Sequence, residues 1–206
     1  MLSWLLAVIG GYLVGAIPIG VILGRLSRGL DVREHGSGRM GASNVFRTVG
    51  TRAGLAVFAL DLTKGVLIAW AAQTLLASPW LAVAGAVAGI VGHNFPIYLR
   101  FRGGRGVLTY CGGMLVFAWP IGLASTVLGL TLIALTRYAS LGSVVGILVS
   151  IILTALLWGW RQQPPVEVLA YCLGGGGFII FQHRDNIGRL LSGQERKVFE
   201  GRRPQP

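Results

Sequence analysis

The chain has 206 residues, of which 53% are hydrophobic and 12% are charged, and its mean hydropathy is +0.69. Soluble domains carry about 25% charged residues, so this composition excludes an ordinary soluble domain and predicts a single polytopic membrane domain. The net charge is +11, but the basic residues gather in loops between apolar runs. This pattern favours membrane lipid headgroups and phosphorylated substrates as partners, and it argues against nucleic acid.

The N-terminal apolar run, from Leu2 to Leu23, is long enough to cross a bilayer and lacks the basic region and cleavage site of a signal peptide. We therefore predict a retained membrane span, which Pro18 is expected to kink. Small residues let helices approach closely in lipid. Four glycines of this run are candidates for such contacts: Gly10, Gly11, Gly15 and Gly20.

The first polar loop contains the segment Glu34–Arg47, which holds three glycines, two serines, one asparagine and two arginines. Glycine lets a backbone turn tightly and present its N–H groups, and the side chains supply further donors. Together these groups suit an oxyanion, most often a phosphate. A polar loop of helix-capping residues explains the composition equally well.

The second predicted span, Gly54 to Ala77, contains two charges at a spacing that places Asp61 and Lys64 on one helix face. Charges inside a span are costly and mark either a functional site or an internal ion pair that only locks helices together. The third span, Trp80 to Tyr98, ends near His93. We expect His93 to be a hydrogen-bonded structural residue, because no second histidine or carboxylate lies near it in the sequence to form a metal site.

A second glycine-rich basic loop runs from Arg100 to Thr109 directly into an apolar helix. A glycine-rich turn that leads into a helix N-terminus is a ready anion site. The spacing differs from that of a Walker A loop. A solvated basic turn is the alternative interpretation.

The apolar stretch from Val107 to Leu135 is interrupted at Trp119-Pro120. Two short helices here bring the total to seven spans, which places most basic residues on the inner side of the membrane. The predicted orientation has the N-terminus outside and the C-terminus in the cytoplasm. Spans from Ala139 to Trp160 and from Val166 to Gln182 follow. The four-glycine run Gly174–Gly177 favours either close packing or a helix break.

The predicted fold class is an all-α integral membrane protein with about seven transmembrane helices and short, broken helices near the glycine-rich loops. Residues 1–192 form the predicted membrane domain, and residues 193–206 form a cytoplasmic tail that we expect to be frayed. Cys111 and Cys172 both lie in apolar runs and provide neither a disulfide framework nor a metal-ligand spacing.

With these loops identified, the chain resembles the bacterial acyl-phosphate:glycerol-3-phosphate acyltransferases of the PlsY type. The resemblance covers nearly the full length and depends on the order and spacing of eight short motifs. These are Gly15–Gly20, Asp31–Gly38, Gly41–Arg47, Asp61–Gly65, Gly92–Pro96, Gly103–Val107, Arg137–Leu141 and His183–Ile187.

The resemblance implies a seven-helix bacterial inner-membrane enzyme with its motifs on the cytoplasmic side. Such an enzyme transfers a fatty acyl group from acyl phosphate to glycerol 3-phosphate, and it releases lysophosphatidic acid and phosphate as the first step of phospholipid synthesis. We expect it to act as a monomer without a metal or another cofactor. The implied catalytic residues are Ser37, His183 and Asn186. The implied substrate-binding residues are Arg47, Gly103, Gly104, Arg105, Gly106, Thr109, Ser140 and Asn44.

The sequence does not identify the general base of the reaction, because none of its three histidines is followed by an acidic residue five positions later. Either His183 or the phosphate of glycerol 3-phosphate is expected to take the hydroxyl proton. The chain departs from the family pattern at Arg39, where the family usually has Asn, and at Arg105, where it usually has Lys.

These departures keep two alternatives open: a divergent paralogue that acylates another phosphorylated acceptor, and a membrane carrier for a phosphorylated solute. A CDP-alcohol phosphotransferase is less compatible, because its three candidate aspartates, Asp31, Asp61 and Asp185, are widely separated.

Overall fold

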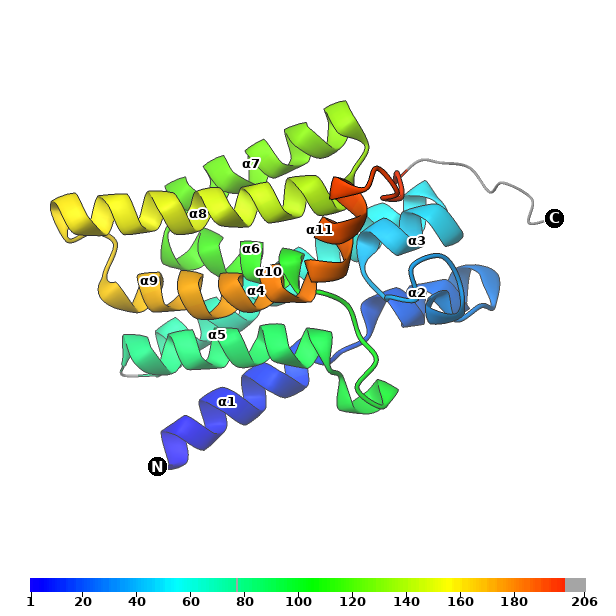
Figure 1. Ribbon diagram of the computed structural model, residues 1–206. Coiled ribbons are helices and arrows are strands. Elements are labelled where there is room, and N and C mark those ends of the chain that lie inside the picture. Colours follow the sequence, from blue (N-terminus) through cyan, green and yellow to red (C-terminus); the bar gives the residue numbers. More distant parts are fainter. Residues whose placement is uncertain (77, 199–206) are drawn as a thin grey trace.

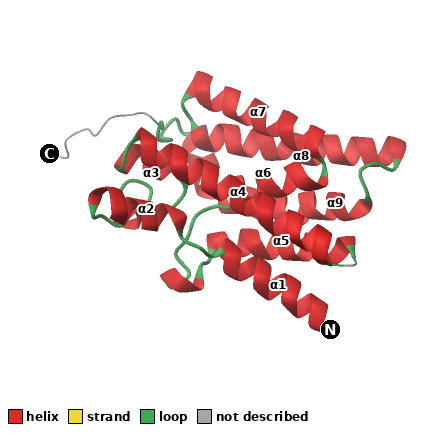
Figure 2. Ribbon diagram, turned by 180° about the vertical axis from the view of Figure 1, so that it is seen from behind, coloured by secondary structure: helices red, strands yellow, loops and turns green. Residues whose placement is uncertain are grey.

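The computed structural model describes residues 1–76 and 78–198. Within this part of the chain, every regular element is a helix (Figure 2). The long helices run side by side between two ends of the molecule, and the N-terminus lies at the end opposite to α2 and α11 (Figure 1). The predicted all-helical membrane architecture is confirmed.

The helices follow one another along the chain with few long connections. They are α1 (Leu2–Gly15), α2 (Ile19–Arg28), η1 (Val32–Glu34), α3 (Ala42–Thr48), α4 (Thr51–Leu75), α5 (Pro79–Asn94), η2 (Ile97–Leu99), α6 (Val107–Phe117), α7 (Trp119–Thr136), α8 (Ala139–Arg161), α9 (Val166–Tyr171), the π-helix η3 (Cys172–Gly176), α10 (Gly177–Gln182) and α11 (Arg184–Leu191).

The predicted spans correspond to these helices, but they are of unequal length. Five segments are long and apolar enough to cross a membrane: Leu2–Arg28, α4, Pro79–Leu99, α7 and α8. A sixth is the bent pair formed by Val166–Gln182 and α11, which meet at 56°. The seventh is α6, whose 11 residues extend only about 16 Å at 1.5 Å per residue, short of the roughly 30 Å hydrocarbon core.

Both predicted helix breaks occur beside the prolines on which the predictions depended. The first span is divided into α1 and α2 at Pro18, and the fourth apolar run is divided at Ala118, directly before Trp119 and Pro120. Each break interrupts the helical hydrogen-bond ladder, since proline has no N–H to donate. The shortness of α6 follows from the second break.

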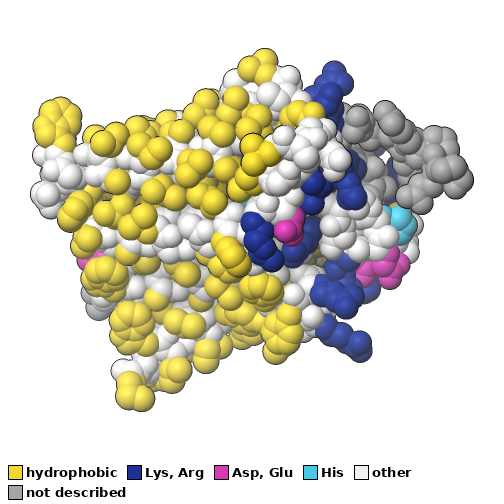
Figure 3. Space-filling view, viewed as in Figure 1, with side chains coloured by type: hydrophobic (Ala, Val, Ile, Leu, Met, Phe, Trp, Pro, Cys, Tyr) yellow, Lys and Arg dark blue, Asp and Glu magenta, His cyan; other side chains and the backbone are white. Residues whose placement is uncertain are grey.

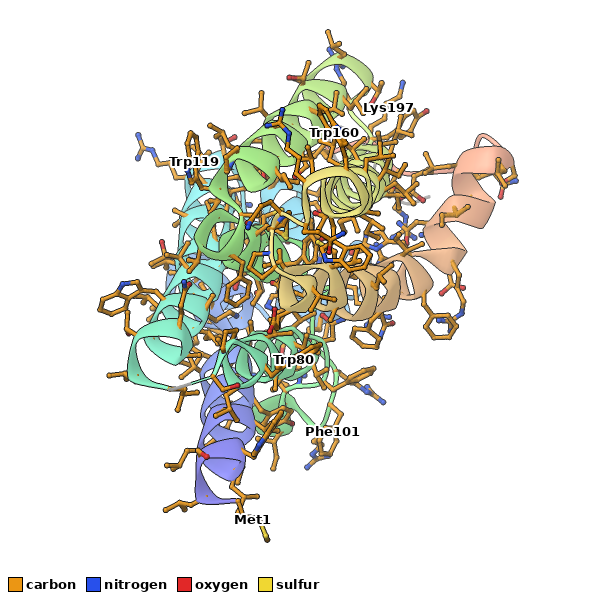
Figure 4. All side chains as sticks on the ribbon, turned by 90° about the vertical axis from the view of Figure 1, so that its left-hand side faces the viewer. Met1, Trp80, Phe101, Trp119, Trp160 and Lys197 are labelled. Atoms are coloured by element: carbon orange, nitrogen blue, oxygen red, sulfur yellow. The ribbon has the colours of Figure 1, made fainter. Side chains whose placement is uncertain are left out.

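The surface separates sharply by residue type. Apolar side chains cover the body of the bundle, whereas lysine and arginine gather at the end that carries α2, α3 and α11 (Figure 3). At the opposite end, which faces the viewer in Figure 4, three exposed tryptophans lie at helix ends: Trp80, Trp119 and Trp160. Exposed tryptophans at helix ends are typical of a membrane–water interface, and together with the apolar covering they identify the apolar body as the membrane-embedded part.

Glycines at helix crossings allow backbones to touch, as predicted for the first span. A Cβ atom added at Gly11 would lie 2.1 Å from the carbonyl oxygen of Gly85, and one at Gly15 would lie 2.1 Å from that of Gly89. Gly10, by contrast, has no atom within 4 Å of such a Cβ. The α1–α5 contact therefore depends on Gly11 and Gly15, whereas Gly10 contributes nothing to it.

We expect Gly11→Ala to lower the thermal unfolding midpoint of the detergent-solubilised protein, because the new methyl group forces α1 and α5 apart. Overpacking costs about 1–3 kcal/mol, which is on the order of 5 °C for a chain of this size. Gly10→Ala, on the preceding residue, is the matched control and should leave the midpoint unchanged or slightly higher. Equal effects of the two substitutions would contradict the close α1–α5 contact.

The four-glycine run near the end of the chain produces a π-helical turn and not a break. The π-helix η3 covers Cys172–Gly176 and joins α9 to α10 without interrupting the helical path. Gly175 and Gly176 are buried, and added Cβ atoms there would lie 2.9 Å from Ile90 and 3.0 Å from Ile147. Close packing is therefore the role of this pair.

Candidate active site

A cavity of about 670 Å³ opens at the basic end of the bundle. Its polar part is lined from three separated parts of the sequence: the first loop with α3, the residues around Arg105, and α11 with the segment that follows it. Its apolar part continues between α6, α7 and α8, where Leu108, Leu130 and Ile147 line it. One cavity therefore joins a cationic region to an apolar channel.

The first loop is organised by Asn44, which the sequence predicted as a substrate-binding residue. Its Oδ1 accepts from the backbone N–H of Ser37 at 2.9 Å. Its Nδ2 lies 2.7, 2.8 and 3.1 Å from the carbonyl oxygens of Val32, Arg39 and His35. Because both ends of the amide are engaged by the loop backbone, Asn44 positions the loop. It also lines the cavity, and its predicted contact with substrate stays a prediction.

Arg47 lies on α3 and lines the cavity with a buried Nε that has no hydrogen-bond partner among the described residues. Burial lowers the pKa of its guanidinium, nearby Arg196 lowers it further, and Glu195 opposes the change. A buried cationic donor without a partner is costly unless a ligand satisfies it. The position therefore fits an anion.

The second loop is anchored to the end of α5. The N–H of Gly103 donates to the carbonyl of Asn94 at 3.2 Å, and the N–H of Gly104 donates to that of His93 at 3.0 Å. Both N–H groups thus anchor the loop, and neither glycine lines the cavity. The predicted phosphate cradle at Gly103 and Gly104 stays a prediction. These two glycines are needed because added Cβ atoms would collide with His93, at 2.2 and 2.1 Å.

The rest of this loop does face the cavity. Arg105 and Gly106 line it, and the N–H groups at the beginning of α6 have no intrahelical acceptor. Burial and, next, the positive charge of Arg39 lower the pKa of Arg105 to about 10. The guanidinium therefore stays protonated at neutral pH. Its Nε is also buried without a partner in the described part of the chain. Thr109 is buried below the loop and does not line the cavity.

A glutamate that the sequence analysis placed in the tail lies at the centre of the third group. Oε1 of Glu195 accepts from Ser140 at 2.9 Å and from Asn186 at 2.6 Å. Oε2 accepts from Arg189 at 2.8 Å. Glu195 therefore fixes two predicted site residues, Ser140 and Asn186, on different helices. A lone acid within the basic run Arg189–Lys197 was the sequence signal that could have identified it.

Residues beyond Glu195 continue along the site. The Arg196 guanidinium donates to the carbonyl of Gly36 in the first loop, and the N–H of Val198 donates to the carbonyl of Arg137 at 2.8 Å. This part of the predicted tail is thus folded against the membrane domain. Residues 199–206, for which we predicted fraying, lie outside the described residues.

His183 lies at the bend between α10 and α11 and lines the cavity. Its Nδ1 is 2.8 Å from the carbonyl oxygen of Ile179. Since a carbonyl only accepts, Nδ1 carries the hydrogen and donates it, and Nε2 of the neutral ring is left as an acceptor. His183 therefore presents an accepting Nε2 on a buried ring whose Nδ1 is held by the backbone.

The predicted Asp61–Lys64 pair is present and buried, with Nζ 2.9 Å from Oδ1. Lys64 also donates to Nδ1 of His93 at 3.0 Å and to the carbonyl of Ile17 at 3.3 Å, at the break between α1 and α2. Through the carbonyl of His93 the network reaches Gly104 of the second loop. The pair therefore joins α4 to α5 and to the break between α1 and α2, and it supports the second loop.

The family model described as "Glycerol-3-phosphate acyltransferase" matches residues 5–193. A protein of that name from Synechococcus sp. (strain JA-3-3Ab) is 43% identical over 96% of this chain and 94% of its own length. One from Thermoanaerobacter pseudethanolicus is 39% identical over 94% of each chain.

Solved structures match as well. The crystal structure of PlsY (YgiH), an integral membrane glycerol 3-phosphate acyltransferase, in its glycerol 3-phosphate form superposes with a TM-score of 0.86 at 34% identity over 95% of both chains. Its lysophosphatidic acid form superposes with a TM-score of 0.84 over the same shares.

Proposed function

Because this chain belongs to the glycerol-3-phosphate acyltransferase family, it is a multi-pass membrane enzyme that acylates glycerol 3-phosphate to lysophosphatidic acid, and we propose that its acyl donor is an acyl phosphate. Both substrates of such a reaction carry a phosphate. We further propose that Arg47 binds the phosphate of glycerol 3-phosphate, and that Arg105 with the beginning of α6 binds that of the donor.

The observation that carries this proposal is the pair of unpartnered cationic donors in one cavity. The Nε atoms of Arg47 and Arg105 are both buried without a partner in the described residues, and both side chains line the same cavity. Two separate arginines suit two phosphates, because a planar guanidinium matches phosphate geometry.

The shape of the cavity supports an acyl donor. From Ala134 to Ser125 its lining follows α7 into the bundle, a depth of about 14 Å at 1.5 Å per residue. This part is lined mainly by leucine, isoleucine and glycine, so a fatty chain can lie there while its phosphate remains at the arginines. The reacting carbonyl would then lie between the apolar and cationic parts.

The reaction needs little from the enzyme beyond positioning. The acceptor hydroxyl oxygen attacks the carbonyl carbon, its proton leaves, and the bond from that carbon to the bridging oxygen breaks with release of inorganic phosphate. Acyl phosphate is an activated mixed anhydride, so electrostatic stabilisation and orientation can supply most of the acceleration. Ser37, which lines the cavity, and Asn186 are proposed to orient the reacting groups.

His183 is proposed to take the hydroxyl proton at Nε2, with the acceptor's own phosphate as the alternative base. We expect His183→Ala to lower kcat by about 100-fold or more, since general-base catalysis contributes 10²–10⁴-fold. Steady-state kinetics with saturating substrates measure this effect, with the thermal midpoint as a check on folding. Near-full turnover of a folded variant would assign the proton to the acceptor phosphate.

Donor identity is tested by offering the purified protein palmitoyl phosphate or palmitoyl-CoA with glycerol 3-phosphate and measuring lysophosphatidic acid by mass spectrometry. The proposal expects product only from palmitoyl phosphate. Product from palmitoyl-CoA alone would reject the acyl phosphate donor while leaving the acyltransferase activity intact.

The proposed orientation places the basic end and the site in the cytoplasm of a bacterial cell, with the N-terminus outside. Its support is the gathering of basic residues at one end, which follows the positive-inside rule (Figure 3). Reporter fusions after Arg161 and after Ser192 test it. They should report outside and inside locations respectively, and the reverse result would invert the topology.

A further inference from the structure

Arg39 is a cationic residue of the cavity that the proposed reaction has not used. It lines the cavity and is half-buried. Within residues 1–76 and 78–198, no carboxylate lies within ion-pair distance of its guanidinium. By contrast, Arg189, which also lines the cavity, is paired with Glu195.

The backbone at Arg39 is fixed on both sides. Its carbonyl accepts from Nδ2 of Asn44 at 2.8 Å, Gly38 before it has a φ of +69°, and Met40 after it is 1% exposed. Holding a flexible, charged residue at such an ordered turn restricts where its side chain can reach. The loop therefore presents Arg39 to the cavity from a defined place.

Arg39 and Arg105 line the same cavity. Arg39 is the charge that most strongly opposes the protonated guanidinium of Arg105, whereas the corresponding charge for Arg47 is Arg196. The carboxylate of Glu195 is already used by Ser140, Asn186 and Arg189. Arg39 and Arg105 thus repel each other across a region where an anion would relieve the repulsion.

We propose that Arg39 and Arg105 together clamp the phosphate of the acyl donor, and that Arg39 sets how tightly the donor and the released inorganic phosphate are held. This inference rests on the proposed function, because it assigns the donor phosphate to Arg105. Two guanidinium groups supply several charge-assisted hydrogen bonds to one phosphate. The same clamp would retain inorganic phosphate after the carbonyl–oxygen bond breaks.

The test is the kinetics of Arg39→Asn with inorganic phosphate as the second probe. We expect the KM for palmitoyl phosphate and the inhibition constant of inorganic phosphate against it each to rise about tenfold, the effect of losing one charge-assisted contact. The KM for glycerol 3-phosphate should change by less than about twofold. Arg39→Lys keeps the charge but loses the planar fork, so its donor and phosphate constants should lie between those of the wild type and of Arg39→Asn.

The matched control is Arg102→Asn, which removes a positive charge from an exposed residue that does not line the cavity. It should leave both KM values and the inhibition constant within about twofold of the wild-type values. This result would exclude a general electrostatic attraction of anionic substrates as the cause of the Arg39→Asn effect. Unchanged donor and phosphate constants in folded Arg39→Asn would overturn the clamp, as would a rise confined to the KM for glycerol 3-phosphate. Failure of the wild type to use palmitoyl phosphate would instead reject the donor, and calorimetric titration with inorganic phosphate would then decide the clamp independently.

Discussion

Arg47→Ala is expected to raise the KM for glycerol 3-phosphate on the order of 100-fold, with a smaller change in the KM for the acyl donor. The Arg47 side chain lies in the cavity with a buried Nε that has no partner in the described residues. Its removal leaves a buried phosphate without a charged partner, which costs about 1.5–3 kcal/mol. Steady-state kinetics with each substrate varied in turn separate the two effects.

The matched variant for this position is Arg47→Lys, which retains the charge and loses the bidentate geometry. It should recover part of the lost affinity. An unchanged KM for glycerol 3-phosphate in Arg47→Ala, with the protein folded, would remove Arg47 from the acceptor site. A rise confined to the KM for the acyl donor would instead assign Arg47 to the donor phosphate and Arg105 to the phosphate of glycerol 3-phosphate.

Asp61→Asn is expected to damage stability much more than turnover. Its carboxylate is 2% exposed and neutralises Lys64 inside the membrane-embedded body. Breaking a buried pair by removing one partner costs about 3–5 kcal/mol, which corresponds to a fall of roughly 10 °C in the thermal midpoint. Below that midpoint, kcat should remain within about threefold of the wild type, because neither side chain is assigned a chemical step.

Two further variants keep this prediction specific. The double variant Asp61→Asn/Lys64→Met should lose less stability than the sum of the single losses, since it leaves no unpaired charge. Glu34→Gln removes an exposed carboxylate and should have no measurable effect. Additive losses in the double variant would contradict a coupled pair, and loss of turnover at full stability would give Asp61 a direct part in the reaction.

The sequence was most informative where a local rule fixes the structure. Pro18 and Trp119-Pro120 removed backbone donors inside apolar runs, so the breaks that they predicted occur. Asp61 and Lys64 are three residues apart on one helix, a spacing that permits the observed ion pair regardless of the rest of the fold. His93 has the structural role expected of it.

Features that depend on contacts between distant segments were not predictable in this way. Glu195 belongs to the site only because α11 bends by 56° from the preceding helix and returns the following segment over α8. The N–H groups of Gly103 and Gly104 are occupied because the loop folds back on α5. Asn44 was assigned to the substrate, yet its amide is held by the backbone of its own loop.

The most direct test of the proposed reaction is phosphate release by the purified protein in lipid, given palmitoyl phosphate with and without glycerol 3-phosphate. We predict that release requires glycerol 3-phosphate and matches lysophosphatidic acid formation one for one. Release at the same rate without the acceptor, or lysophosphatidic acid formed without phosphate, would contradict acyl transfer from acyl phosphate at this site.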